Sequence, residues 1–366
     1  MADRVKIGII GCGQIANIHL HAYQELPVEI VAAADIDEAA LARAAQEYDI
    51  KHPVTDFREL LKIEEIQAVD VCLHNNLHAP VTIAALEAGK HVYCEKPIAG
   101  SYADGLAMVE AAGRTGKMLA MQLFTLFSLD TKAAQRLIQE GFLGDMYYAK
   151  SIGYRRRGRP YVDGYGTSSF VQQKIAAGGA LFDMGVYHIA QVLHLLGNPA
   201  IKSVSGTAHQ AIPMYEDRRQ NSNYDVEELG VGLVRLDGGV TFVIEESWAV
   251  NMGQPSASEL HGSKGGVRLD PFSFHSTVAD MEMDATFDLR GADLRWHQCL
   301  PDTDAYDSAQ AHWVAALQGR VPLIDSAGLG LATMKISEGI YLSTKLRREV
   351  TGEEVEKASK STATEL

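Results

Sequence analysis

The sequence predicts an α/β protein, in which an N-terminal domain with a mostly parallel sheet precedes an α+β domain with an open, largely antiparallel mixed sheet. Three observations predict this fold class. Strands and helices alternate over the first 122 residues, a glycine-rich turn follows the first strand, and several β-rich runs follow residue 201. Such alternation is typical of a parallel sheet covered by helices on both faces. At roughly 100–200 residues per domain, we expect two domains, 1–125 and 126–366.

Short apolar runs and helical patterns define the elements of the first domain. Asp37 is expected to cap the second helix, and Gly89 to end the fourth. The expected strands are 5–10, 29–34, 68–73, 90–93 and 118–122, and the expected helices are 14–26, 37–48, 56–62, 80–88 and 101–114.

The second domain is expected to mix helices with an antiparallel sheet. A long strand at 145–154 leads into a polar, glycine-rich loop, and Asp237-Gly238-Gly239 is a hairpin signal between two further strands. We expect the tail beyond Thr351 to be frayed and the last helix to be able to pack back on the first domain. The expected helices are 131–139, 181–196, 307–318 and 327–348.

The composition excludes several classes of protein. The net charge is −14, and Arg155-Arg156-Arg157 is the single basic block, which argues against nucleic-acid and membrane partners. There is no run of 18 apolar residues and no signal-peptide pattern at the N-terminus. The four cysteines form no C-x-x-C pair, so we expect a reducing, cytoplasmic setting.

The turn Gly11-Cys12-Gly13-Gln14-Ile15-Ala16 follows an apolar strand and opens a helix. Gly11 permits the tight turn, Gly13 lets backbone amides approach a pyrophosphate, and Ala16 is a small residue that allows close packing. This context predicts a dinucleotide-binding Rossmann domain. Asp35 ends the second strand, where a carboxylate binds ribose hydroxyls and repels a 2′-phosphate, so we expect NAD rather than NADP.

Polar side chains follow the strand that ends at Leu73. His74, Asn75, Asn76 and His78 are expected at the carboxyl edge of the sheet, where they could contact the cofactor. His78 could instead cap the next helix. Neither His74 with His78 nor His19 with His21 has a third ligand at close spacing, so we expect no metal.

Lys96 lies in Cys94-Glu95-Lys96-Pro97, directly after an apolar strand. At the sheet edge this lysine is a candidate proton carrier. A neighbouring nicotinamide cation would lower the pKa of its ammonium, which would suit proton transfer. Glu95 could steady Lys96 or the cofactor.

A second candidate cluster follows Gly178-Gly179. Asp183 and Tyr187 are four residues apart and share a face of an α-helix, whereas His188 lies one step around it. A structural alternative is a helix cap at Asp183 beside core aromatic residues.

These motifs together resemble the Gfo/Idh/MocA family of oxidoreductases over nearly the full length. The matching segments are the nucleotide turn 11–16, Asn75-Asn76-Leu77-His78, Glu95-Lys96-Pro97, Gly178-Gly179-Ala180-Leu181-Phe182-Asp183-Met184-Gly185-Val186-Tyr187 and Gly262-Ser263-Lys264-Gly265-Gly266.

The resemblance implies NAD(P)-dependent hydride transfer at a sugar, cyclitol or related alcohol, and a homo-oligomer assembled through the second sheet. Lys96 would orient and deprotonate the reacting hydroxyl, with Asp183 nearby. Many members have histidine four residues after that aspartate. This chain has Tyr187 there and His188 one later, so its acid/base partner is either of the two.

The loop that starts at Tyr154-Arg155-Arg156-Arg157 resembles a subgroup that includes glycoside 3-dehydrogenases and C-glycoside 3-oxidases. This implies substrate contacts from Lys96, Tyr154, Arg156, Asp183 and His188. The leading hypothesis is thus an NAD-dependent oxidoreductase acting on a secondary hydroxyl of a sugar or glycoside. Its alternatives are an inositol or other polyol dehydrogenase, a sugar–sugar oxidoreductase with tightly held cofactor, and a non-catalytic NAD-binding regulatory protein.

Overall fold

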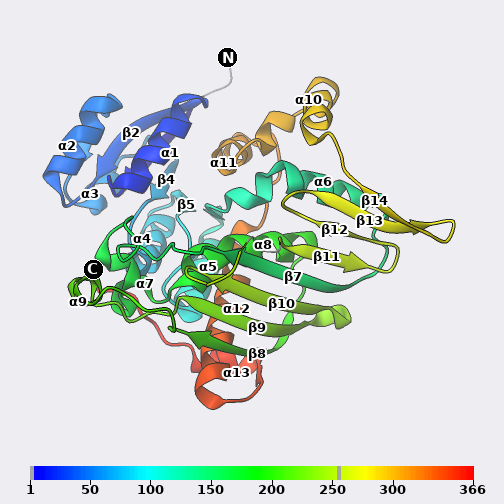
Figure 1. Cartoon of the computed structure of the whole chain (residues 1–366). Helices are drawn as coiled ribbons and strands as arrows, with labels where there is room; N and C mark the ends of the chain where they lie inside the picture. The colour runs from blue at the N-terminus through cyan, green and yellow to red at the C-terminus, as the bar shows by residue number, and fades with distance from the viewer. Residues whose placement is uncertain (1–3, 254–256) are drawn as a thin grey trace.

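The computed structural model describes residues 4–253 and 257–366, which form two sheets with helices around and between them (Figure 1). The first sheet has six parallel strands in the order β3-β2-β1-β4-β5-β6, which is the strand order of a Rossmann domain. Its topological switch point lies between β1 and β4, where ligands bind at the carboxyl ends of the strands. The strands are β1 Val5–Ile10, β2 Val28–Ala34, β3 His52–Val54, β4 Ala68–Val71, β5 His91–Cys94 and β6 Leu119–Met121.

Helices connect these parallel strands as the sequence predicts, with one difference at α4. This helix begins at Asn75, five residues before its expected start, and includes Pro80. Proline has no N–H to donate to the carbonyl four residues earlier, which is that of Asn76. The main-chain N–H of Thr364 donates to this oxygen instead, at 3.0 Å. The helices are α1 Gln14–Gln24, α2 Glu38–Glu47, α3 Phe57–Leu61, α4 Asn75–Glu87 and α5 Tyr102–Thr115.

The second sheet has nine strands in the order β14-β13-β12-β11-β7-β10-β9-β8-β15. Every pair is antiparallel except β7 with β10, so the sheet is mixed and largely antiparallel, as predicted. The turn Asp237–Gly239 joins β9 to β10 as a hairpin. The strands are β7 Met146–Tyr154, β8 Ile201–His209, β9 Leu229–Leu236, β10 Thr241–Ser247, β11 Glu259–Gly262, β12 Gly265–Arg268, β13 Ser273–Val278, β14 Met281–Ala285 and β15 Val350–Thr351.

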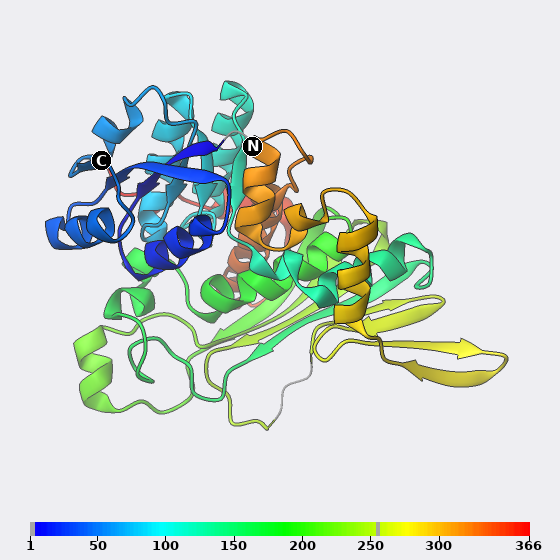
Figure 2. The same ribbon diagram turned by 90° about the horizontal axis from the view of Figure 1, so that it is seen from above.

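Helices cover one face of the second sheet, and Figure 2 shows the opposite face free of helices over most of the drawn strands. α8 packs on β7, while α12 packs on β8 and also on α5 of the first domain. A single buried apolar cluster includes Ile7 and Val92 of the first sheet and Phe242 of the second. The longer helices here are α6 Leu129–Gln139, α8 Val186–Leu195, α10 Leu289–Cys299, α11 Ala309–Leu317 and α12 Ser326–Leu346.

Short helices complete the chain, and a π-helical turn, η3, directly precedes α8. No described helix has the length and apolar character needed to cross a membrane. The short elements are η1 Phe124–Phe127, η2 Ser168–Val171, α7 Gln173–Ala176, η3 Leu181–Gly185, α9 Glu216–Ser222, η4 Asp237–Gly239, η5 Thr303–Tyr306 and α13 Gly352–Ala358.

The expectation of a frayed tail is wrong. Thr351 and Glu354 form a capping box at the start of α13. Beyond that helix, the N–H of Thr362 donates to Asp104 Oδ2 at 2.8 Å, and Asn76 Nδ2 donates to Thr364 Oγ1 at 2.7 Å. The tail is ordered because side chains and carbonyls of the first domain pair with its backbone.

Candidate active site

Lys96 and Asp183 form an ion pair, although 87 residues separate them in the sequence. Lys96 follows β5 at the carboxyl edge of the first sheet, and Asp183 lies in the π-turn η3. The distance between Lys96 Nζ and Asp183 Oδ1 is 2.7 Å, and Nζ also donates to the main-chain oxygen of Asp183 at 2.9 Å. The two side chains are 14% and 19% exposed, so the pair lies near the surface of a mostly water-excluded site.

Two further side chains hold the other oxygen of Asp183. The indole Nε1 of the fully buried Trp248 donates to Oδ2 at 2.9 Å, and a guanidinium nitrogen of Arg155 lies 3.7 Å from it. Arg155 also donates to the hydroxyl of Tyr165 at 2.7 Å. The Asp183 carboxylate is thus fixed from both sides, which keeps the Lys96 ammonium in one place.

The group that faces the Lys96 ammonium in this structure is a carboxylate, and the pKa of Lys96 is raised. Burial lowers the pKa of Lys96, but Asp183, Tyr187 and Glu95 together outweigh burial and raise it above the ordinary value. Burial raises the pKa of Asp183, but Lys96, Arg155 and the hydrogen bond from Trp248 together outweigh burial, and the pKa of this carboxyl is lowered. The pair is therefore charged at neutral pH, and Lys96 serves as a hydrogen-bond donor.

Tyr187 contacts Lys96 through its ring. The ammonium lies 5.0 Å from the ring centroid, within cation–π range, and Phe124 packs against the ring with centroids 4.4 Å apart. Burial raises the pKa of the Tyr187 hydroxyl to about 12. This residue is thus a neutral phenol at physiological pH.

His188 forms a second polar pair with Glu246 of β10. Nδ1 of His188 lies 2.9 Å from Glu246 Oε2, and Ser151 Oγ donates to Oε1 of the same carboxylate at 2.7 Å. Glu246 is fully buried, whereas His188 is 29% exposed. Burial lowers the pKa of His188, but Glu246 outweighs burial and raises it above its usual value. With Nδ1 engaged, Nε2 is available to a substrate.

Asp183 lies in the π-turn η3, and Tyr187 and His188 lie in the first turn of the helix α8 that follows it. The spacing argument from the sequence assumed an α-helix, in which only Tyr187 follows Asp183 on one face. In a π-turn the hydrogen bonds join residues five apart, so α-helical spacing does not describe the positions of the side chains that follow Asp183. Such turns occur frequently at functional sites.

Gly153 makes room for the histidine pair. It is an interior residue of β7, where glycine is otherwise unfavourable. A Cβ at this position would lie 2.3 Å from Glu246 Oε2 and 2.4 Å from His188 Nδ1. The sequence reasoning missed both Gly153 and Glu246, and a glycine inside a predicted strand was the one available signal.

The glycine turn fits a dinucleotide. Gly11 has a φ of +93°, and a Cβ there would lie 2.3 Å from the carbonyl oxygen of Cys72. A Cβ on Gly13 would meet nothing within 4 Å, so its exposed backbone faces open space. No side chain caps α1 at Gly13, which leaves helix N–H groups for a pyrophosphate. Gln14 is exposed and Ile15 half-buried at this end, while Ala16 is buried.

Asp35 lies beside the same turn. Its Oδ2 accepts from the N–H of Cys12 at 2.6 Å, and its Oδ1 accepts from the N–H of Asp37 at 2.8 Å. The carboxylate is half-buried at the end of β2. This is the position at which a carboxylate meets ribose hydroxyls in Rossmann domains.

The polar residues after β4 separate into two groups. Asn75 donates from Nδ2 to the carbonyl of Ala176 at 2.7 Å, which joins the start of α4 to the second domain. His78 is fully buried, and its ring nitrogens lie 2.8 Å and 3.0 Å from the carbonyl oxygens of Pro97 and Leu73. Asn75 thus lies at the domain junction, whereas His78 links the main chain at Leu73 to the main chain at Pro97, next to Lys96.

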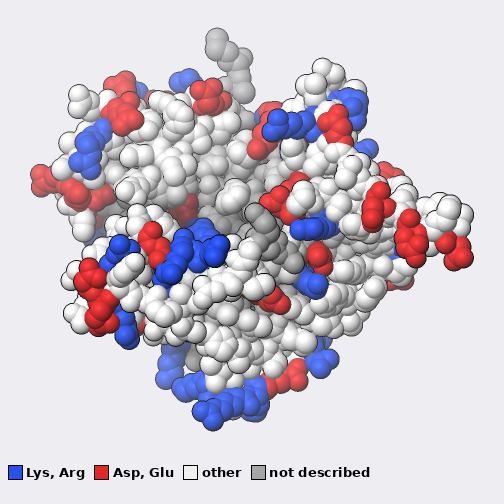
Figure 3. Space-filling view, in the orientation of Figure 1, with Lys and Arg blue, Asp and Glu red and all other residues white. Residues whose placement is uncertain are grey.

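Glu95 and Tyr154 have hydrogen-bond partners other than the Lys96 ammonium, which donates to Asp183. Glu95 is 4% exposed and accepts from the N–H of its neighbour Lys96. Tyr154 donates its hydroxyl to Glu245, which projects from the sheet face opposite Glu246. Arg156 is exposed, and the structure brings Arg155 rather than Arg156 to Asp183. Figure 3 shows basic side chains grouped beside a hollow in the middle of this face.

The glycine turn on a Rossmann sheet, with a fixed lysine at the edge of that sheet, defines an NAD-dependent oxidoreductase. Residues 5–123 match the family model described as "Oxidoreductase family, NAD-binding Rossmann fold", and residues 131–268 match the "GFO/IDH/MocA C-terminal domain". The chain belongs to the Gfo/Idh/MocA family, which confirms the resemblance inferred from its motifs.

Several relatives have names that describe them as dehydrogenases of sugars or related compounds. The chain is 28% identical over 350 residues to D-glucoside 3-dehydrogenase of Escherichia coli, covering 93% of this chain and 95% of the relative. It is 25% identical to D-apiose dehydrogenase of Paraburkholderia graminis, covering 95% and 89%. The structure of levoglucosan dehydrogenase with NADH and L-sorbose has the same fold, with a TM-score of 0.79 at 21% identity and coverage of 95% and 99%.

Proposed function

We propose that this protein oxidises a secondary hydroxyl of a sugar or glycoside with NAD, and that C-3 of a glucoside is the preferred position. The observation that carries the proposal is the Lys96–Asp183 pair at the carboxyl edge of the nucleotide-binding sheet. The similarity to D-glucoside 3-dehydrogenase, which spans both domains, supports the choice of carbon.

Lys96 positions the substrate in this proposal. Because Asp183 raises its pKa, Lys96 remains an ammonium and donates a hydrogen bond to the oxygen of the reacting hydroxyl. Asp183 holds the ammonium by its carboxylate and its carbonyl. As negative charge develops on the substrate oxygen, the fixed ammonium stabilises it.

His188 receives the hydroxyl proton. Lys96 and Tyr187 are both protonated at neutral pH, so neither can accept a proton. His188 loses its proton as the pH rises through its raised pKa, and its neutral form can then accept the hydroxyl proton at Nε2. Glu246 holds Nδ1–H and stabilises the imidazolium that forms. Bound NAD takes the hydride from the carbinol carbon, so the C–H and O–H bonds break as the carbonyl forms.

The remaining assignments concern binding. We propose that the turn at Gly11 and Gly13, with Gln14 and Ile15, holds the pyrophosphate, and that Asp35 holds the adenosine ribose. Asn75, His78, Glu95 and Lys96 would shape the nicotinamide side. Arg156 would contact the part of the substrate farthest from the reacting carbon, because it adjoins Arg155, which reaches Asp183. The expected substrate contact of Tyr154 is not kept in this proposal, because its hydroxyl binds Glu245 on the sheet face opposite Glu246.

The proposal also includes the oligomeric state of the protein and its location in the cell. The uncovered face of the second sheet carries the partly exposed apolar side chains Val231, Leu233 and Val243, which supports a homo-oligomer assembled through this face. Light scattering after size exclusion would reveal it. All four cysteines are free thiols, which supports a reducing cytoplasm.

A panel of glycosides, free sugars and inositols tests the function directly. We expect NADH to accumulate with at least one pyranoside, and NMR of the product to place the ketone at C-3. Lys96→Ala is expected to lower kcat by about 100- to 1,000-fold while NAD still quenches tryptophan fluorescence. Lys62→Ala, at an exposed lysine of the same domain, is the control. Unchanged turnover in Lys96→Ala would refute the mechanism, and no NADH with any substrate would favour a binding protein.

A further inference from the structure

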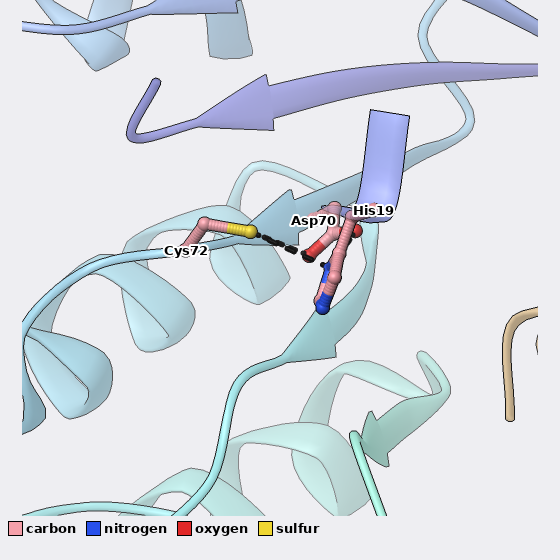
Figure 4. A group of neighbouring side chains, drawn as sticks. All are labelled: His19, Asp70 and Cys72. Carbon is pink, nitrogen blue, oxygen red and sulfur yellow. Dashed lines mark hydrogen bonds and ion pairs between the residues drawn. The ribbon is translucent and has the colours of Figure 1, made fainter. Parts of the chain in front are cut away.

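A buried ionic bridge connects the nucleotide-binding helix to the lysine loop. His19 lies in α1 and is fully buried. Its Nδ1 lies 2.8 Å from Asp70 Oδ2, and its Nε2 lies 2.9 Å from Glu95 Oε1. Figure 4 shows the imidazole beside Asp70 at the end of β4, with the thiol of Cys72 directed at the same carboxylate. Three elements of the first domain therefore meet at one histidine ring.

The geometry fixes the charge of this histidine. A neutral imidazole has one N–H, but both nitrogens of His19 face carboxylate oxygens, so both can donate only in the cation. Burial lowers the pKa of His19, but Asp70 and Cys72 together outweigh burial, and the pKa lies well above its usual value. The other groups facing the ring are neutral donors or aromatic rings: Tyr23 donates to Asp70 Oδ2 at 2.8 Å, Cys72 to Oδ1 at 3.4 Å, and Tyr93 packs with its centroid 5.8 Å away.

The bridge ends on the main chain of Lys96. One oxygen of Glu95 accepts from His19, and the other accepts from the N–H of Lys96 at 2.9 Å. Glu95 is 4% exposed, so water cannot readily replace either partner. The orientation of the Glu95 carboxylate, and through it the position of the Lys96 backbone, therefore depends on the imidazolium.

We propose that His19 is a positioning residue for the reaction. It is a fixed cation between two buried carboxylates, and it holds Glu95. Glu95 in turn sets the position of Lys96 relative to α1, the helix that follows the glycine turn. The inference rests on the proposed role of Lys96. His19, Asp70 and Cys72 could also ligate a metal by chemistry, since their ligand atoms lie within 4.8 Å of one another. Hydrogen bonds already occupy each of these atoms, which favours the bridge.

The charge of His19 can be measured without any turnover. In protein labelled with ¹⁵N-histidine, we expect one imidazole to keep both nitrogens protonated at neutral and mildly alkaline pH, and its signals to disappear in His19→Gln. A neutral tautomer at this position would overturn the proposal. Stoichiometric zinc in the purified protein would overturn it as well.

Kinetics test the positioning role. His19→Gln keeps hydrogen-bonding atoms but removes the charge, so we expect kcat to fall roughly 10- to 100-fold with KM for NAD nearly unchanged. His21→Gln, at an exposed histidine of the same helix, should have wild-type kinetics. If His19→Gln does not fold, Glu95→Gln carries the test, because its amide cannot accept from both His19 and Lys96.

The outcomes separate this inference from the proposed function. Absence of turnover in the wild-type protein would refute the proposed function, whereas the NMR measurement would still decide the charge of His19. An active wild-type protein with unchanged kcat in His19→Gln would refute the positioning role, even if the variant melted at a lower temperature.

Discussion

Replacement of Glu246 by glutamine should move the pH profile of oxidation to lower pH. In the proposed mechanism His188 must be neutral to accept the hydroxyl proton, so activity rises with pH through the pKa of His188. In the wild-type protein Glu246 raises that pKa against the opposing effect of burial. Glu246→Gln removes the anion and leaves burial, so the pKa of His188 falls and the acidic limb of the profile moves with it.

The magnitude follows from the distance. An opposite charge within about 4–6 Å changes a pKa by roughly 1 to 3 units, and Glu246 Oε2 lies 2.9 Å from His188 Nδ1. We therefore expect the acidic limb to move down by at least about one pH unit. The plateau rate should also fall at least about 10-fold, because a glutamine amide can hold the wrong tautomer of the ring.

The assay is kcat/KM for glycoside oxidation over a range of pH, with a matched control on the neighbouring residue. Glu245 lies next in sequence but on the opposite face of the sheet, where it binds Tyr154. Glu245→Gln should therefore leave the acidic limb in place. An unchanged acidic limb in Glu246→Gln, with folding intact, would refute the assignment of His188 as the base. A limb that moved equally in both variants would point to a general loss of negative charge.

Three further predictions address stability and the cofactor. Because the pKa of His188 is raised in the folded protein, its pairing with Glu246 stabilises the fold at pH values below the pKa of an unfolded histidine. This stabilisation is lost as the pH rises through the pKa of His188 in the folded state. In urea unfolding, Glu246→Gln should therefore lose more free energy of unfolding, relative to wild type, at acid than at alkaline pH. Gly11→Ala should destabilise by about 2 kcal/mol or more, because of its φ of +93° and the contact with Cys72; an unchanged melting temperature would contradict this. Asp35→Ala should weaken NAD binding several-fold and reduce the preference for NAD over NADP. The measurement is the ratio of kcat/KM with NAD to kcat/KM with NADP, and the same ratio in the wild-type protein and the variant would argue against a ribose contact.

Local sequence patterns were sufficient to predict the framework. The glycine turn, the strand endings before Asp35 and Lys96, and the alternation of strands and helices predicted the Rossmann domain and the largely antiparallel second sheet, although the short edge strand β3 was not predicted. These features depend on neighbours in the chain. A strand that ends in a parallel sheet places its next residue at the carboxyl edge whatever happens elsewhere.

Contacts between distant segments were beyond the reach of those patterns. The C-terminal tail, which was expected to be frayed, is the clearest case. Pro80 has no N–H to donate to the carbonyl of Asn76, and the N–H of Thr364 near the other end of the chain donates to it instead. A polar tail is expected to be disordered only when it has no such partners.

The sequence by itself determined that this chain binds a dinucleotide beside a lysine. Only the tertiary structure decided how that lysine is held, because Asp183, Glu246 and Asp70 reach their partners across long stretches of chain. The structure places the Tyr187 ring against Lys96, as the spacing favoured, and pairs His188 with Glu246 of β10, which the sequence did not predict. Burial then set the charges, since a carboxylate in a water-excluded site holds its partner protonated only when folding brings the two within hydrogen-bond distance.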